Sequence, residues 1–135
     1  MTRQVLRLGK PWEKTVRFSL GVVTDGRLLH TAGITARDPH GEVVGVGDIR
    51  AQTAQCFSNL NEIIVAAGAQ LEDVVKYTIF TTDIERFHTE TLALRAPFFC
   101  GNPAATLVEV SRLIDPRMLV EIEAIVRIGD TEASS

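Results

Sequence analysis

The run from Gly101 to Ile128 alternates hydrophobic and polar residues, and this alternation predicts two β-strands that form a hairpin around a turn at 114–117. Successive side chains of a strand point to opposite faces. One face of the last strand is entirely apolar and contains Met118, Val120, Ile122, Ala124, Val126 and Ile128. The other face is mixed and contains Leu119, Glu121, Glu123, Ile125 and Arg127.

The first strand of this pair carries the same alternation. Its parity assigns Thr106, Val108 and Val110 to the core side, and Ala105, Leu107, Glu109 and Ser111 to the opposite side. A second sheet face with Leu107, Glu109, Glu121, Glu123 and Ile125 is too apolar for a solvent face and too charged for a sealed core, because a buried carboxylate is costly unless it is paired. We therefore expect this face to be an oligomer interface.

The N-terminal part of the chain predicts further strands. Residues 3–8 form a short leading strand, and residues 17–23 and 27–32 form two strands around Thr24-Asp25-Gly26, since Asp-Gly between apolar runs favours a hairpin. Residues 34–47, rich in glycine, are expected to form a loop with a short extended segment at Val43-Val44.

Two stretches have the apolar spacing of helices. The first runs from Ile49 to Ala67, with Asp48 as its N-cap and Gly68 as its stop signal. The second runs from residue 83 or 84 to about Phe99, with Pro97 disturbing its last turn. Between them, the β-branched and aromatic residues of 74–82 predict a strand. The order predicts an α+β fold in which two helices pack on one face of a mixed sheet.

Length and charge narrow the possible functions. The 135 residues predict one domain, 1–135, that ends in a polar tail at 129–135. The net charge is −3, and the basic residues are scattered along the sequence. They do not form the clustered basic patch that nucleic-acid binding requires, so we expect no nucleic-acid partner. The sequence shows neither a membrane span nor a signal peptide, which favours a cytoplasmic location without a membrane partner.

The candidate metal ligands do not form a site. His30, His40 and His88 share no ligand spacing, and Cys56 and Cys100 belong to no metal or redox motif, so no metal or other cofactor is expected. Cys56 lies on the apolar stripe of the first helix and is expected in the core. His30 alternates with Leu28 and Ala32, and a hydrogen-bonded strand histidine is a simpler interpretation for it than a ligand contact.

The residues from Pro103 to Glu109, with the run Val120-Glu121-Ile122-Glu123-Ala124, resemble the C-terminal signature of the Rid family, the reactive intermediate deaminases also called YjgF. The resemblance extends from about Phe18 to the end of this signature. It implies a chorismate-mutase-like fold, a homotrimer with a ligand cleft at each subunit interface, and hydrolysis of enamines or imines to a carbonyl compound and ammonia.

The same resemblance implies the site residues. Glu121 matches the glutamate that directs water, and the alternative is an interface glutamate paired with an arginine of a neighbour. The substrate-binding positions would be Phe18, Ser19, Ala32, Gly33, Ala105, Thr106 and Leu107. For Phe18 and Gly33 the alternatives are a core aromatic residue and a glycine that ends a strand.

The chain departs from the family at Ala105. Deaminating members have an arginine there that binds the substrate carboxylate, and a methyl group cannot replace a planar guanidinium. The sequence is therefore closest to a branch that lacks the arginine. Arg17, Arg95 and Arg112 are the candidates to replace it, and a surface ion pair is the alternative for each.

Two classes of function remain open at this point. One is a hydrolase of an enamine or imine whose recognition does not need an arginine at position 105. The other is a trimeric small-molecule-binding or regulatory protein without catalysis. The two differ at Glu121, which only the enzyme needs for turnover.

Overall fold

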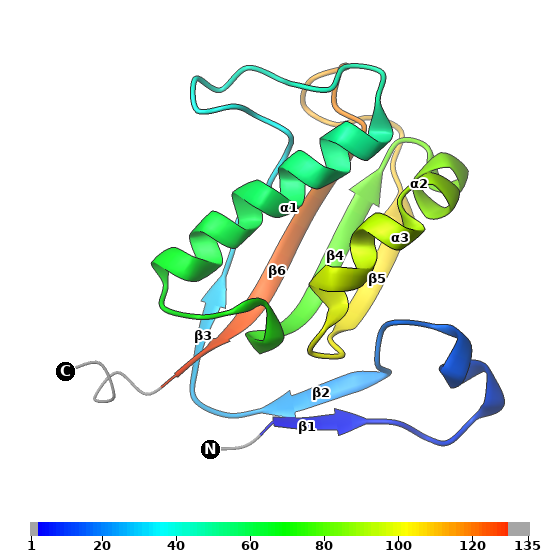
Figure 1. Cartoon of the computed structure of the whole chain (residues 1–135), viewed down its shortest axis with the longest axis vertical. Helices are drawn as coiled ribbons and strands as arrows, with labels where there is room; N and C mark the ends of the chain where they lie inside the picture. Colours follow the sequence, from blue (N-terminus) through cyan, green and yellow to red (C-terminus); the bar gives the residue numbers. More distant parts are fainter. Residues whose placement is uncertain (1–2, 130–135) are drawn as a thin grey trace.

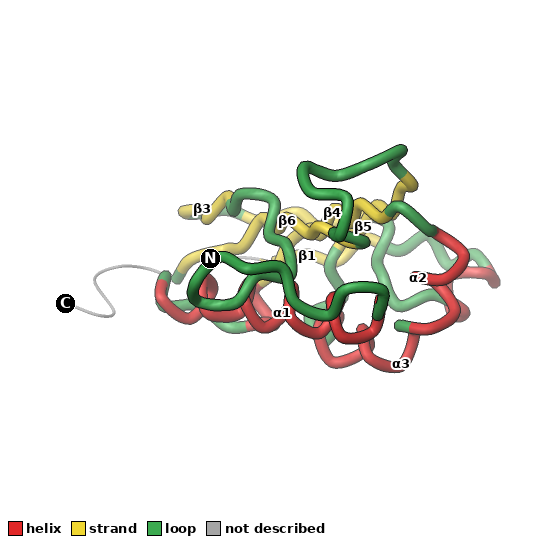
Figure 2. The backbone as a smooth tube through the Cα atoms, turned by 90° about the horizontal axis from the view of Figure 1, so that it is seen from above, coloured by secondary structure: helices red, strands yellow, loops and turns green. Residues whose placement is uncertain are grey.

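The computed structural model describes residues 3–129, so residues 130–135 of the predicted polar tail lie outside the described residues. Helices cover one face of a mixed sheet, with the strands in one layer and the helices in another (Figures 1 and 2). The strands are β1 (Arg3–Leu6), β2 (Gly21–Thr24), β3 (Arg27–His30), β4 (Val74–Thr81), β5 (Ala104–Glu109) and β6 (Val120–Ile128). The helices are α1 (Ile49–Ala66), α2 (Ile84–Glu90) and α3 (Leu92–Arg95), with short 3-10 helices η1 (Pro11–Thr15), η2 (Leu71–Asp73) and η3 (Ala96–Phe99).

The main sheet has the strand order β3-β6-β4-β5, and β1 and β2 form a separate two-stranded ribbon. β4 and β5 are parallel, whereas β6 runs antiparallel to both β3 and β4. The α+β class with a mixed sheet and helices on one face is therefore confirmed.

The predicted hairpin around Asp25-Gly26 is wrong. β2 pairs with β1, with Val22 opposite Val5, while β3 pairs with β6, with Leu29 opposite Val126. Gly26 does adopt a left-handed φ of 89°, as the predicted turn requires. After this turn, however, the chain enters the main sheet and does not pair with β2. β6 is the longest and most buried strand, so its edge offers β3 a better partner than β2 does.

The predicted C-terminal hairpin is also wrong, because β4 lies between β5 and β6. Ile79 of β4 is opposite Leu107 on one side and Ile122 on the other. β4 alternates buried side chains with half-buried ones, and the central position satisfies the hydrogen-bonding groups of both its edges.

The burial of β6 agrees with its sequence pattern, but that of β5 does not. Met118, Val120, Ile122, Ala124 and Val126 are buried, which confirms the apolar face. In β5, Ala105 and Leu107 pack against the core, whereas Thr106 and Val108 are exposed. The expected parity of β5 is thus reversed, since parallel pairing in register with β4 turns Ala105 and Leu107 to the same face as Tyr77 and Ile79.

The sheet face away from the helices is hereafter called the open face. Pairing across the strands gives it Leu28, His30, Lys76, Thr78, Phe80, Thr106, Val108, Glu121, Glu123, Ile125 and Arg127. Leu107 and Glu109, expected on this face, are not part of it. Leu107 faces the helices, and the Glu109 carboxylate accepts a hydrogen bond of 3.0 Å from the Ile84 amide at the start of α2.

Helix α1 forms as the sequence predicts. The Asp48 side chain accepts a hydrogen bond from the Ala51 amide and so caps the helix. The apolar stripe that includes Cys56 and Phe57 is fully buried, and Gly68 ends the segment with a φ of 81°.

The second predicted helix is interrupted at Thr91. Its hydroxyl is buried and donates a 2.6 Å hydrogen bond to the Phe87 carbonyl, and the segment continues as α3 and η3 instead of one helix to Phe99. A threonine that bonds back to the preceding turn favours such a bend. Pro97 then lies in η3.

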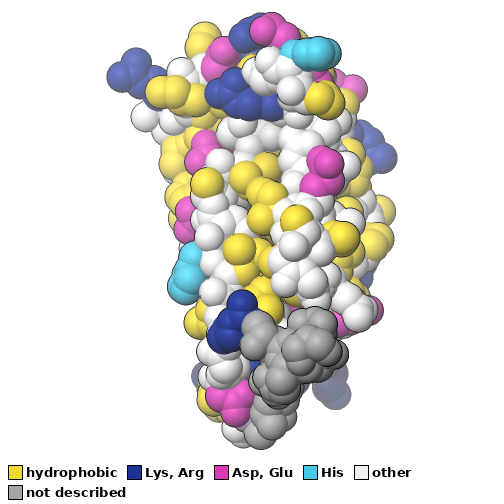
Figure 3. Space-filling model, turned by 90° about the vertical axis from the view of Figure 1, so that its left-hand side faces the viewer, with side chains coloured by type: hydrophobic (Ala, Val, Ile, Leu, Met, Phe, Trp, Pro, Cys, Tyr) yellow, Lys and Arg dark blue, Asp and Glu magenta, His cyan; other side chains and the backbone are white. Residues whose placement is uncertain are grey.

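Part of the hydrophobic surface lies outside the core. Seen from the side of β3 and α1, hydrophobic side chains reach the surface between charged groups (Figure 3). Leu28 on the open face and Val65 on α1 are 43% and 61% exposed. Within residues 3–129, no helix combines the length and hydropathy that a membrane span needs.

Candidate functional site

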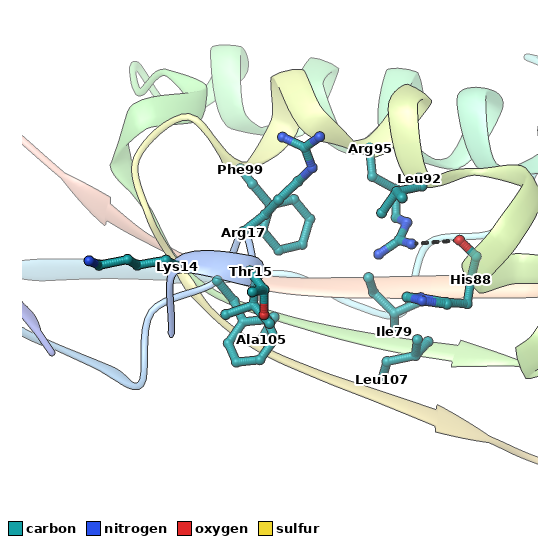
Figure 4. A pocket seen from close by; sticks show the side chains of 12 residues that line it. Lys14, Thr15, Arg17, Ile79, His88, Leu92, Arg95, Phe99, Ala105 and Leu107 are labelled. Atoms are coloured by element: carbon teal, nitrogen blue, oxygen red, sulfur yellow. Dashed lines mark hydrogen bonds between the residues drawn. The ribbon is translucent and has the colours of Figure 1, made fainter. Parts of the chain in front are cut away.

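A pocket of about 490 Å³ lies between the segment 14–18, the α2–α3 region and the strands β4 and β5 (Figure 4). Because β5 is the edge strand of the main sheet, the pocket lies at the margin of the sheet. Its apolar lining consists of Val16, Phe18, Ile79, Leu92, Phe99, Ala105 and Leu107. A mostly apolar cavity with a few polar groups is the usual form of a small-molecule site.

The polar lining of the pocket is basic. Lys14, Arg17 and Arg95 line it together with His88 and Thr15, and no aspartate or glutamate of residues 3–129 does. Arg95 is half-buried, whereas Lys14 and Arg17 are exposed. In a chain of net charge −3, this concentration of cationic groups indicates a site for an anionic or strongly polar ligand group.

Two of the predicted substrate-binding positions, Phe18 and Ser19, have different places. Phe18 lines the pocket. Ser19 is buried beneath it, where its amide donates a 2.8 Å hydrogen bond to the Pro103 carbonyl and its hydroxyl contacts the Gly21 carbonyl at 3.3 Å. These bonds attach the segment 14–18 to the start of β5, so Ser19 positions Phe18.

Glu121 lies on the open face and packs over Gly33. A Cβ atom at position 33 would overlap with the Glu121 carboxylate, so only a glycine leaves room for this arrangement. The preceding segment is fixed to β6, because the Thr31 amide donates to the Ala124 carbonyl at 3.0 Å and the Ile34 amide to the Ile122 carbonyl at 2.8 Å. Ala32 and Gly33 are exposed, and Glu121 is half-buried.

The carboxylate of Glu121 has no ion-pair partner among the described residues, since no arginine or lysine there lies within ion-pair distance of it. A half-buried carboxylate beside exposed backbone can accept a proton from a water molecule and hold the water in place.

Glu121 and Ala105 are not neighbours within one chain. Glu121 points to the open face and Ala105 to the helix face, and β4 separates their strands. Thr106 lies on the same face as Glu121, but it is exposed at the edge strand. The structure therefore groups the predicted positions into two sets: Phe18, Ala105 and Leu107 in the pocket, and Ala32, Gly33, Thr106 and Glu121 on the side of the open face.

The pocket also contains residues that the sequence pattern did not select. Ile79, Leu92 and Phe99 come from three elements, and only the packing of α3 on the sheet brings them to Ala105. Of the three arginines that the sequence offered as replacements for the missing one, Arg17 and Arg95 line the pocket, whereas Arg112 is exposed outside it. The sequence showed their charges, but it did not show which of them lie close together in the fold.

The remaining candidate groups do not build a site within residues 3–129. No group of three histidine, cysteine or carboxylate side chains is placed to hold a metal ion there. His30 lies on the open face opposite Ile125. Cys56 is buried as expected, and burial, followed by the charge of Glu121, raises the pKa of its thiol to about 12.

Comparisons with known proteins extend over most of the chain. The model of the family described as Endoribonuclease L-PSP matches residues 10–128. A RutC family protein of Pyrococcus horikoshii is 42% identical over 102 residues, which cover 74% of this chain and 79% of that protein. A RutC family protein of Sulfurisphaera tokodaii is 36% identical over 105 residues, covering 77% and 82%.

Solved structures of related proteins are also similar to this chain. YyfB of Yersinia pestis, a Rid family protein of unknown function, is 32% identical with a TM-score of 0.84, covering 95% of this chain and 100% of that chain. The YjgF gene product of E. coli is 36% identical with a TM-score of 0.66, covering 82% and 87%.

Proposed function

Because the chain belongs to the Endoribonuclease L-PSP family, which includes YjgF and the Rid proteins, we propose that it hydrolyses an enamine or imine metabolite to a carbonyl compound and ammonia. The observation that carries this proposal is the half-buried, unpaired Glu121 carboxylate packed over Gly33. No cofactor is needed for this reaction, because water supplies the oxygen atom.

Glu121 acts as a general base and then as a general acid. The substrate reacts as a protonated imine, which an enamine forms by taking a proton from solvent at its β-carbon. Glu121 takes a proton from a water molecule as the water oxygen attacks the C=N carbon, which leaves a neutral tetrahedral carbinolamine. The protonated carboxyl then returns this proton to the nitrogen. As the C–N bond breaks, the hydroxyl proton passes to the Glu121 carboxylate, which leaves a carbonyl group and free ammonia, and Glu121 then releases the proton to solvent.

The complete site is proposed to form between two subunits. Glu121 and the pocket lie on opposite faces of the sheet within one chain, so a ligand that contacts both needs the open face of one subunit near the pocket of the next. A homotrimer with a cleft at each interface satisfies this requirement. The half-apolar open face, with Phe80, Val108 and Ile125, supports the same assembly.

Ala105 makes the substrate different from that of deaminating relatives with an arginine. Without a guanidinium at this position, a substrate such as 2-aminoacrylate loses a bidentate contact worth roughly 2–4 kcal/mol, about thirty- to a thousandfold in affinity or rate. We expect weak or absent turnover of 2-aminoacrylate, measured by coupled reduction of the keto acid product. Turnover comparable to that of arginine-bearing relatives would contradict this expectation.

The direct test of catalysis replaces Glu121 by glutamine. Glu121→Gln keeps the shape but removes the basic oxygen, so hydrolysis should fall by roughly two orders of magnitude or more while the assembly persists. Glu123→Gln is the matched control, because Glu123 lies on the same strand and the same face. Ammonia release from a panel of imines generated in situ measures the rate.

Full activity in Glu121→Gln would rule out Glu121 as the base. A second function, a trimeric binding or regulatory protein without catalysis, is favoured by Ala105 alone. That function predicts ligand binding that Glu121→Gln leaves unchanged, with no ammonia release by the unaltered protein.

A further inference from the structure

Arg95 is held in place by contacts that leave its charge uncompensated. Its Nε donates a 2.9 Å hydrogen bond to the Thr91 hydroxyl, and one terminal nitrogen donates a 3.1 Å hydrogen bond to the His88 carbonyl. The guanidinium also lies 4.9 Å from the centroid of the Phe87 ring. A side chain ordered in this way loses little further freedom when it binds a ligand.

Arg17 brings a second guanidinium to the same pocket from a distant part of the chain. Figure 4 shows Arg17 and Arg95 on the helix side of the pocket, above Ala105 and Leu107, whereas Lys14 extends away from them. Burial, and then the positive charge of Arg17, lower the pKa of Arg95. Arginine nevertheless keeps its charge at neutral pH, so two like charges face one cavity.

Neither charge is balanced within the described part of the chain. The ion pairs there involve Arg86, Arg117 and Arg127, and neither Arg17 nor Arg95 has a carboxylate within ion-pair distance. Two neighbouring cations repel each other, and a bound anion would remove that repulsion. The arrangement therefore favours an anionic ligand group over a neutral one.

We propose that Arg95 and Arg17 bind the carboxylate of the substrate, and that its apolar body lies over Ile79 and Leu107. The small methyl side chain of Ala105 leaves room for a branched or aromatic body in the cavity of about 490 Å³. The substrate class is thus a carboxylic acid that is more apolar and bulkier than 2-aminoacrylate. This inference rests on the proposed function only in taking the pocket as the substrate site.

The test compares two unreactive probes of nearly equal shape, 4-methylpentanoate and the neutral 4-methylpentanamide. NMR titration of the unaltered full chain should show tighter binding of the carboxylate, and higher salt should weaken carboxylate binding but not amide binding. Arg17→Gln and Arg95→Gln should each weaken carboxylate binding about tenfold or more, with amide binding unchanged.

Control variants separate charge from folding and assembly. Arg112→Gln removes an exposed arginine outside the pocket and should bind like the unaltered chain. Arg17→Gln removes an exposed side chain that has no ion-pair partner among the described residues, so the fold should persist. Arg95→Lys should restore part of the binding lost in Arg95→Gln. Equal binding of acid and amide, or equal loss in Arg112→Gln, would overturn the proposal. Dissociation of the oligomer in Arg17→Gln and Arg95→Gln would also overturn it, because the arginines would then serve assembly.

The outcome is independent of catalysis, because neither probe reacts. Charge-dependent binding without any ammonia release would support this anion site and contradict the hydrolase. Ammonia release from neutral imines, without charge-dependent binding, would support the hydrolase and contradict this anion site. Glu121→Gln should retain carboxylate binding if both proposals hold.

Discussion

Gly33 controls where the Glu121 carboxylate can lie, although 88 positions separate them in the sequence. The side chain of Glu121 packs directly over the glycine Cα, so its position depends on a missing Cβ atom. The overlapping atoms are the flexible end of a glutamate and not backbone, which means that the fold can accept an alanine if the carboxylate moves.

Gly33→Ala should therefore displace the proposed base without changing its charge. We expect hydrolysis to fall about ten- to a hundredfold, since a displacement of about 1 Å costs catalysis on that scale. Thermal unfolding should remain near that of the unaltered chain. Gly129→Ala is the control, because an added Cβ there meets nothing within 4 Å. Unchanged turnover in Gly33→Ala would show that the position of this carboxylate does not matter.

The two cysteines should differ sharply in reactivity. The thiolate is the reactive form, and a pKa raised to about 12 leaves Cys56 about one part in ten thousand ionised at pH 8. Cys100 is exposed, although burial of its sulfur and the charge of Glu72 raise its pKa as well. A thiol reagent should label one cysteine per folded chain rapidly and the second only after unfolding.

Cys100→Ser tests this assignment. The variant should lose the rapid reaction. The remaining cysteine, Cys56, should then be labelled appreciably only in denaturant or at a pH near the pKa of its thiol. Rapid labelling of Cys100→Ser would mean that Cys56 is accessible in the folded chain.

At the scale of elements, a buried glutamine connects α1 to the start of β6. The Gln52 amide nitrogen donates a 2.8 Å hydrogen bond to the Arg117 carbonyl, and its oxygen accepts a 2.7 Å hydrogen bond from the Leu119 amide. Gln52 is fully buried, so its own amide group depends on these two backbone partners for its hydrogen bonds. The connection fixes the strand that carries Glu121 against the helix layer.

Gln52→Ala should lower the free energy of unfolding by about 1–3 kcal/mol, because it removes two hydrogen bonds between α1 and the start of β6 together with a fully buried side chain. Urea denaturation followed by circular dichroism measures the change. Gln55→Ala is the control on the same helix, since the Gln55 side chain donates a hydrogen bond to the Asn59 side chain of α1 and does not connect the helix to β6. Equal midpoints for the two variants would show that the connection adds nothing to stability.

At the scale of the whole molecule, the open face is the part that a single chain leaves uncovered. Its residues combine apolar side chains with Glu121 and Glu123, and the helices cover only the other face (Figure 2). We expect a homotrimer, with a mass by light scattering of three times the 14.8 kDa of the chain. A monomeric mass at micromolar concentration would remove the interface cleft and the proposed composite site.

Val108→Lys provides a localised version of this test. Val108 lies on the open face and is 36% exposed, so a lysine there should weaken the trimer without unfolding the chain. Val65→Lys is the matched control, because Val65 is 61% exposed on α1, away from this face. Dissociation of Val65→Lys alone would place the interface on the helix layer.

The sequence by itself determined those features that depend on near neighbours in the chain. Asp48 and Gly68 set the ends of the α1 segment, and the alternation of β6 predicted its buried face, because capping and strand periodicity act over a few residues. The family signature around Glu121 is likewise continuous in the sequence.

Only the tertiary structure decided which strands pair and which side chains meet. Strong local signals predicted two hairpins. In the structure, however, β3 pairs with β6, and β4 lies between β5 and β6. These pairings are favoured because a central strand forms hydrogen bonds along both of its edges. This pairing turned Leu107 toward the helices and brought Arg17 and Arg95 to one pocket. Such proximity depends on how helices and strands pack across long sequence separations, which hydrophobic periodicity does not encode.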